Sequence, residues 1–329
     1  MSSRYAAAYE HPNGPGDARP TAEQIVQHEG LVGKWTDKVI LITGCSSGIG
    51  VETAKALSKT GAKLYLTARS LEKAQKALGE LAESPNVHLL QLDQESLDSV
   101  RVCASAFLAH NDRLHLLIAN AGVMMTRKER TKDGFELQFG VNHLAHFLLI
   151  NLLMPALLAA STPSFQSRVV ILSSTGHKFS SVNFENINFD GEFDAMKAYG
   201  QSKTANLWTA NEIERRYGSN GLHAFSVHPG AVTTNLGQHM SEEEIQAITQ
   251  DPDLMASYMN PAQGAATSVW AAVSKDLEGQ GGKYLENCQI STPHDAAGGF
   301  WAPGYGPHAF DAAGATHLWN ASLKYVSLE

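Results

Sequence analysis

The sequence predicts one α/β domain, a doubly wound parallel sheet of seven strands with helices on both faces. Two observations support this fold class. From residue 38 onward, short apolar runs rich in β-branched residues alternate with segments of helical periodicity, which is the pattern of right-handed crossovers in a parallel sheet. No Pro- or Ser-rich linker interrupts residues 38–287, so these elements are expected to share one domain.

The predicted strands are short apolar runs, typical of strands buried on both faces. In chain order they are Val39–Thr43, Leu64–Ala68, Val87–Leu92, Leu114–Ala119, Arg168–Ser173, His223–His228 and Lys283–Asn287. Helices are predicted near Val51–Thr60, Leu71–Leu81, Leu97–His110, Phe135–Leu158 and Tyr199–Tyr217. Residues 1–36 form a polar N-terminal extension with a short helix near Thr21–Gly30, where Thr21 is the expected cap.

Composition excludes several classes of function. The chain has 25 basic and 33 acidic residues, a net charge of −8, which argues against a nucleic-acid partner. Three cysteines, Cys45, Cys103 and Cys288, form no CxxC pair. His143 and His146 lie one helical turn apart without a Cys or carboxylate at ligand spacing, so we expect ordinary helix residues and no metal.

The N-terminus shows no basic segment followed by an apolar run, so no signal peptide is predicted. The most apolar stretch, Phe147–Ala160, is interrupted by Asn151 and Pro155 and is too short to cross a bilayer. We therefore expect a buried helix and a cytoplasmic protein without a membrane partner.

The first strand runs into the turn TGCSSGIG, residues 43–50, and then directly into a helix. Glycines at 44, 48 and 50 let the backbone approach a pyrophosphate, which the helix N-terminus favours. The same letters match GxSxG, with Ser46 as the nucleophile of a hydrolase. No HGGG-type oxyanion segment lies upstream, so the hydrolase is the weaker alternative.

Two further segments follow strands at the carboxyl edge of the sheet, where open α/β sheets bind ligands. Asn120-Ala121-Gly122 follows the fourth strand, although an Asn-Gly pair can also form a simple turn. Asp93 follows the third strand, where it could bind an adenine amine or cap the next helix.

Tyr199 and Lys203 are spaced i, i+4 on a predicted helix, which places the phenol and the ammonium on one face. A tyrosine that works as an acid or base at neutral pH needs a pKa about three units below its usual ~10, or roughly 4 kcal/mol. A neighbouring lysine and the positive charge of an oxidised nicotinamide favour that shift. Ser173 and Ser174 end the preceding strand.

Taken in order, TGCSSGIG, NAG, VNHLAHF, the double serine, YGQSK and HPGAVTTN resemble the short-chain dehydrogenase/reductase family over about residues 37–287. DGFELQFGVNHLAHFLL and AYGQSKTANL are most similar to its retinol-dehydrogenase and WW-domain-oxidoreductase-like branch. The resemblance implies a Rossmann-type fold and oxidoreduction between a ketone or aldehyde and an alcohol. It also implies a small-molecule substrate.

The resemblance assigns roles to single residues. It implies the catalytic set Asn142, Ser174, Tyr199 and Lys203, with Tyr199 as acid/base, Ser174 on the substrate oxygen and Asn142 holding a relay water. Lys203 would lower the tyrosine pKa and grip the nicotinamide ribose. The cofactor residues that it implies are Gly44, Ser46, Ser47, Gly48, Ile49, Gly50, Arg69, Asp93, Asn120, Ala121, Gly122, Tyr199, Lys203, Pro229, Gly230, Val232 and Thr234.

Cofactor choice is expected to depend on the end of the second strand. An acidic residue there binds the ribose hydroxyls of NAD, whereas this chain has Arg69, which can pair with the 2′-phosphate of NADP. We therefore predict NADP(H) in preference to NAD(H), with a solvated Arg69 as the alternative.

The resemblance also divides the chain into residues 1–36, a catalytic domain over 37–290 with a substrate lid at about 236–262, and a tail over 291–329 expected on the substrate side. A bulky apolar substrate is expected, because several apolar side chains could line its pocket; plain packing is the alternative. These side chains are Phe179, Phe184, Phe189 and Phe193, together with lid residues and the aromatic tail. Two alternatives remain: the chain could form a homodimer through the long helices, and it could be a non-catalytic NADP-binding sensor.

Overall fold

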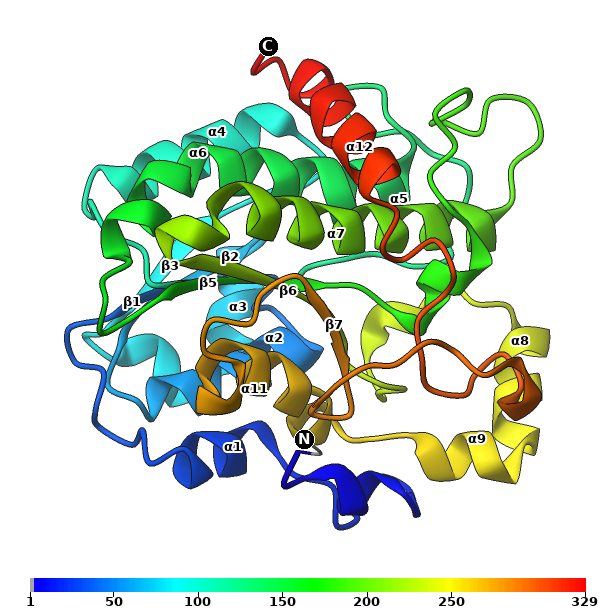
Figure 1. Ribbon diagram of the computed structural model, residues 1–329, viewed down its shortest axis with the longest axis horizontal. Helices are drawn as coiled ribbons and strands as arrows, with labels where there is room; N and C mark the ends of the chain where they lie inside the picture. Colours follow the sequence, from blue (N-terminus) through cyan, green and yellow to red (C-terminus); the bar gives the residue numbers. More distant parts are fainter. Residues whose placement is uncertain (1–2) are drawn as a thin grey trace.

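The computed structural model describes residues 3–329, and its centre is one eight-stranded sheet with the order β3-β2-β1-β4-β5-β6-β7-β8 (Figure 1). The first seven strands are parallel, as predicted. The strands are β1 (Val39–Thr43), β2 (Lys63–Ala68), β3 (Val87–Gln91), β4 (Leu116–Ala119), β5 (Ser167–Leu172), β6 (Leu222–His228), β7 (Lys283–Glu286) and β8 (Gln289–Ile290).

The eighth strand was not predicted. Asn287 and Cys288 both have positive φ, 53° and 51°, and form a tight turn that reverses the chain after β7. β8 therefore pairs antiparallel with β7, over the two pairs Leu285–Ile290 and Glu286–Gln289. A two-residue strand is too short to give a periodic signal, which is why the sequence pattern misses it.

Helices cover both faces of the sheet (Figure 1). On one face lie α1 (Ala22–His28), α2 (Gly48–Ser58), α3 (Leu71–Leu78) and α11 (Ala266–Val273). On the other face lie α4 (Leu97–Leu108), α5 (Leu137–Phe139), α6 (Ala145–Ala160), α7 (Ala195–Tyr217) and α12 (Ala312–Tyr325). Thr21 caps α1 in a capping box with Gln24, as the sequence predicts.

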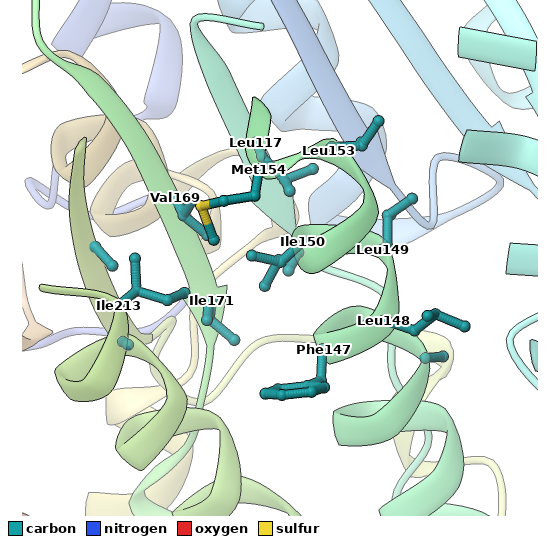
Figure 2. Packing of buried hydrophobic residues seen from close by; sticks show 14 of the residues in the cluster. Leu117, Phe147, Leu148, Leu149, Ile150, Leu153, Met154, Val169, Ile171 and Ile213 are labelled. Atoms are coloured by element: carbon teal, nitrogen blue, oxygen red, sulfur yellow. The ribbon is translucent and has the colours of Figure 1, made fainter. Parts of the chain in front are cut away.

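The core between α6, β4, β5 and α7 is apolar and almost fully buried. Figure 2 shows Ile150 and Met154 of α6 directed toward β5, which carries Val169 and Ile171. Both β5 residues are no more than 1% exposed. A sheet packed on both sides in this way holds the strand ends, and the loops that follow them, in fixed positions.

The long predicted helix is interrupted rather than continuous. The π-helical turn η3 (Gly140–Leu144) joins α5 to α6 and contains Asn142. Together Leu137–Ala160 has the length and hydropathy of a membrane span, but 72% of its most apolar window is buried inside the protein. The segment is therefore a core helix of this fold.

Irregular and short helical segments occupy the carboxyl edge of the sheet and the surface. The 3₁₀ turns are η1 (Ala6–Tyr9), η2 (Gly79–Glu83), η4 (Thr175–Phe179), η5 (Gly218–Asn220), η6 (Asn235–Gly237), η7 (Lys275–Leu277) and η8 (Ala296–Gly298). The expected lid contains α8 (Glu242–Gln250) and α9 (Pro252–Ser257), followed by α10 (Pro261–Gly264). The N-terminal extension packs on this region through Arg19, which donates to the carbonyls of Ser257 and Tyr258.

Candidate active site

The turn after β1 is shaped for a close backbone approach. Gly44 has φ +76°, and a Cβ there would lie 2.8 Å from Cα of Ala121. A Cβ on Gly50 would collide with the carbonyl oxygen of Gly44. Ser47 is the N-cap of α2 but makes no side-chain capping bond, so its side chain leaves the first N–H groups of the helix without a cap. These features fit the pyrophosphate of a dinucleotide, held by the N-terminus of α2.

The remaining residues of the turn surround the same helix start. Ser46, Gly48 and Ile49 are half-buried and Ser47 is exposed. The side chain of Thr234 approaches this turn, since a Cβ on Gly48 would lie 3.2 Å from its methyl carbon. The loop after β6 thus meets the loop after β1.

Asn120, Ala121 and Gly122 are fixed against the end of β1. The N–H groups of Asn120 and Ala121 donate to Thr43 Oγ1 at 2.9 and 3.0 Å, and Asn120 Nδ2 donates to the Thr43 carbonyl at 2.8 Å. A Cβ on Gly122 would lie 3.6 Å from Lys203 Nζ. The segment is therefore locked in place at the sheet edge, next to the predicted catalytic lysine.

Helix α7 places Tyr199 and Lys203 together. Lys203 Nζ lies 5.5 Å from the centre of the Tyr199 ring and donates to the Leu172 carbonyl at 3.1 Å. The exposed fractions of these residues are 6% and 5%. Burial lowers the pKa of Lys203 to about 8.

The tyrosine differs from the expectation in one respect. Burial raises the pKa of Tyr199 to about 12, and a hydrogen bond with the Ser174 side chain opposes this only partly. The protein alone therefore raises the tyrosine pKa, because the loss of water disfavours the phenolate more than the neighbouring groups stabilise it. The phenol therefore stays protonated at neutral pH.

Two adjacent serines have different surroundings. Ser174 is the N-cap of η4, and its Oγ accepts from the N–H of Gly176 at 3.0 Å while remaining partly exposed. Ser173 Oγ is buried and donates to the Lys203 carbonyl at 2.8 Å. The Ser173 hydroxyl is thus used in a hydrogen bond to α7, and Ser174 is the serine that faces Tyr199.

Asn142 is fully buried and each polar atom of its amide is paired. Its Oδ1 accepts from Val123 N–H at 2.8 Å, and its Nδ2 donates to the Val123 carbonyl and to Ser202 Oγ, both at 2.9 Å. The amide therefore ties the segment after β4 to α7. Its relay role stays a prediction.

Arg69 and Asp93, the two residues expected to bind the adenosine part of the cofactor, both form ion pairs. Arg69 is exposed and pairs with Glu95 at 2.7 Å. Asp93 accepts from Lys132 Nζ at 2.7 Å and from the N–H of Glu95 at 3.1 Å. Ser96, rather than Asp93, caps α4, so the helix-cap alternative for Asp93 is wrong.

The loop after β6 carries the last predicted cofactor residues. Pro229, Gly230, Val232 and Thr234 are partly buried. Val232 pairs in a short parallel bridge with Met259, and the Thr234 hydroxyl accepts from the N–H of Leu236. The loop is thereby joined to the end of the lid segment.

Several contributors were not predicted. His177 Nδ1 donates to the Ser174 carbonyl at 2.6 Å, while its Nε2 accepts from the N–H of Gly306 at 2.9 Å. The Nδ1 atom of His228, at the end of β6, is buried and has no hydrogen-bond partner among the described residues. A single histidine in a turn or at a strand end gives no sequence pattern, so neither His177 nor His228 could be predicted.

The histidines singled out in the sequence have structural contacts. His146 contacts Thr43 Oγ1 at 2.8 Å and the Asn142 carbonyl at 2.9 Å, and His143 contacts Ser322 Oγ. No group of three or more His, Cys, Asp or Glu side chains that could bind a metal occurs within residues 3–329. Both histidines are buried helix residues, as the sequence predicts.

Comparison with known proteins identifies the family. The chain matches the family described as short chain dehydrogenase over residues 38–245. It is 48% identical over 325 residues to short-chain dehydrogenase/reductase prx1 of Penicillium roqueforti, covering 99% of this chain and 95% of that protein. It is 35% identical over 318 residues to retinol dehydrogenase 14 of Mus musculus, covering 93% of this chain and 90% of that protein.

A solved structure of a Mycobacterium paratuberculosis protein is also similar, with a TM-score of 0.68 and 29% identity over 94% of this chain and 98% of the other. The Rossmann-like fold and these matches define an oxidoreductase: the chain belongs to the short-chain dehydrogenase family. Within that family, it is a member of the retinol-dehydrogenase-like branch.

Proposed function

We propose that this protein is an NADP(H)-dependent oxidoreductase that interconverts a ketone or aldehyde and an alcohol, with Tyr199 as the acid/base. The proposal rests on one observation above all. Tyr199 lies beside Ser174 and one helical turn before Lys203, and Lys203 faces Gly122 at the edge where the dinucleotide turn begins.

Each side chain has a chemical task in the reductive direction. The Ser174 hydroxyl would hold the substrate oxygen by a hydrogen bond, and Tyr199 would donate its proton to that oxygen. The bound nicotinamide would supply the hydride. Burial raises the pKa of Tyr199 to about 12, so the phenol carries its proton at neutral pH, and the positive charges of Lys203 and of an oxidised nicotinamide would have to lower this pKa for efficient proton transfer.

Lys203 would act mainly by position and charge. Its ammonium is held by the Leu172 carbonyl and lies near Gly122, so it can reach a ribose hydroxyl at that edge. In the oxidative direction its positive charge would favour the phenolate that must form.

The proposed preference for NADP(H) rests on Arg69. Its guanidinium is 74% exposed at the end of β2, and its partner Glu95 is itself 36% exposed. Such surface pairs contribute little, so the guanidinium can exchange the carboxylate for a 2′-phosphate, which carries more charge.

The test is hydride transfer by Tyr199→Phe, followed as NADPH oxidation with a panel of ketones and aldehydes. We expect kcat to fall by at least ~100-fold because the proton donor is lost, while NADPH affinity stays near that of the wild type. Tyr217→Phe, at the other end of α7, is the control and should be fully active. Near-normal turnover by Tyr199→Phe would refute the mechanism, and NADPH binding without turnover of any carbonyl by the wild type would favour the non-catalytic alternative.

A further inference from the structure

Three aromatic side chains from distant parts of the chain meet beside the proposed active site. We call Phe179, Phe300 and Trp301 the aromatic lip. Phe179 and Phe300 are stacked, with ring centres 4.3 Å apart and planes 22° apart. Trp301 meets Phe300 at 5.0 Å and 88°, so the two rings form a right-angled corner.

The lip is connected to the catalytic residues by the short turn η4. Ser174 is the N-cap of this turn and Phe179 is its last residue. Phe179 also lies against α7, since a Cβ on Gly200, the residue after Tyr199, would be 2.9 Å from Phe179 Cβ. A substrate held by Ser174 and Tyr199 would therefore extend toward Phe179 and the tail residues stacked on it.

Lys178 holds the tail part of the lip in place. Its Nζ donates to the carbonyls of Phe300 at 2.5 Å and Ala302 at 2.9 Å, and it lies 5.0 Å from the centre of the Phe300 ring. These bonds satisfy the ammonium internally and orient the loop. Lys178 is thus a positioning residue, and its ammonium also lies against the Phe300 ring.

Part of the aromatic lip is exposed to solvent. Phe300 is 36% exposed and Trp301 is 59% exposed, although exposed aromatic surface of this kind is costly to leave in water. A flat ring placed in a right-angled corner can stack on one wall and meet the other edge-on, and both geometries are favourable for aromatic pairs. A puckered saturated ring of similar size can make neither contact well.

We propose that the aromatic lip binds a flat aromatic group of the substrate, so that aryl ketones or aldehydes are preferred over saturated analogues. The inference rests on the proposed oxidoreductase function and adds a substrate class to it. Phe300 and Trp301 are the residues that select the substrate, and Lys178 orients them.

The experiment compares acetophenone with cyclohexyl methyl ketone, which differ only in the saturation of the ring. The quantity measured is the ratio of kcat/KM for the two ketones with NADPH. We expect the double variant Phe300→Leu/Trp301→Leu to lower this ratio by roughly 5- to 10-fold, because the ring–ring contacts are lost. Phe310→Leu removes another exposed aromatic of the same tail and should leave the ratio unchanged.

Lys178→Met keeps the length of the side chain but removes its hydrogen bonds to the loop. We expect it to raise KM for acetophenone with little change in kcat, which a general loss of folding would not do. An equal ratio in the wild type and the double variant would overturn the role of the lip while leaving the oxidoreductase function intact.

A binding measurement separates the two hypotheses. Saturation-transfer NMR with acetophenone and NADP⁺ reports ketone binding without turnover, and the signal should weaken in the double variant but not in Phe310→Leu. If the wild type binds acetophenone through the lip but reduces no carbonyl, the proposed function fails and the lip stands. Binding that is equal in the wild type and the double variant would refute the lip directly.

Discussion

At the scale of single residues, the ion pair between Arg69 and Glu95 has a direct consequence for cofactor choice. The carboxylate competes with a 2′-phosphate for the guanidinium, and both groups are solvent-exposed. We expect Glu95→Gln to tighten NADPH binding by up to roughly 5-fold, the range of an exposed ion pair, and to leave NADH binding unchanged.

Arg69→Asp should shift the preference toward NADH. Dissociation constants from calorimetry test both, and equal NADPH affinity in wild type and Arg69→Asp would remove Arg69 from the phosphate site.

Other residue-scale features show what sequence can and cannot predict. The i, i+4 spacing of Tyr199 and Lys203 follows from helix geometry, so their proximity was predictable before the fold was known. The pairing of Asp93 with Lys132 joins positions 39 residues apart, which no local pattern encodes. The direction of the Tyr199 pKa shift depends on burial, and burial is set by the whole packed domain.

At the scale of elements, the sequence pattern predicted the parallel strands because most of them are continuous buried runs between helical segments, the edge strand β3 being only half-buried. It failed where the structure departs from a regular period. The π turn at Gly140–Leu144 adds a residue to one helical turn, and no helix was predicted at α12 in the tail. Phe184 and Phe189 were expected at the substrate pocket, with plain packing as the alternative, and the contacts of Phe184 agree with packing. Phe184 packs on His317 of α12, with ring centres 4.2 Å apart.

Trp319 is one of the residues that attach helix α12 to the domain. Its ring is 3% exposed, meets Phe147 of α6 at 4.9 Å and lies 4.8 Å from the guanidinium of Arg216. We expect Trp319→Ala to lower the free energy of unfolding by about 3–5 kcal/mol, because a large buried side chain leaves a cavity. Urea unfolding measures the change, and Lys324→Ala on the exposed side of the same helix should have little effect. Equal stability of Trp319→Ala and the wild type would show that α12 is only loosely attached.

At the scale of the whole molecule, the C-terminal tail (residues 291–329) contacts both the candidate active site and the helices α6 and α7. Its loop contacts η4 through Gly306 and His177, and its helix covers part of α6 and α7. The long helices are therefore partly covered by the chain itself, and we expect a dimer through this face only if α12 is displaced. The sequence placed the tail on the substrate side, which stays a prediction, and the contacts of α12 with α6 and α7 are long-range, so no local pattern encodes them.

Burial of neutral histidines should make the whole fold sensitive to acid. Loss of water lowers the pKa of His143 and His228 to about 3, and that of His146 and His177 to about 4. In the unfolded chain the histidine pKa is about 6.5, so below that pH the unfolded state binds more protons than the folded state and stability falls. Each histidine contributes up to about 1.4 kcal/mol per pH unit in this window.

Two buried carboxyls act in the opposite direction. Burial raises the pKa of Glu136 and of Glu286, so acidification favours the folded state through these groups. Burial also lowers the pKa of His115 to about 4 and that of His88, so six histidines oppose two carboxyls. We expect a net loss of about 3–5 kcal/mol in unfolding free energy between pH 7.5 and 5.5, measured by urea titration. His143→Gln can still reach Ser322 but cannot take up a proton, so its loss should be about 1.4 kcal/mol smaller. If stability is the same at both pH values, the buried histidines do not set the acid limit of this fold.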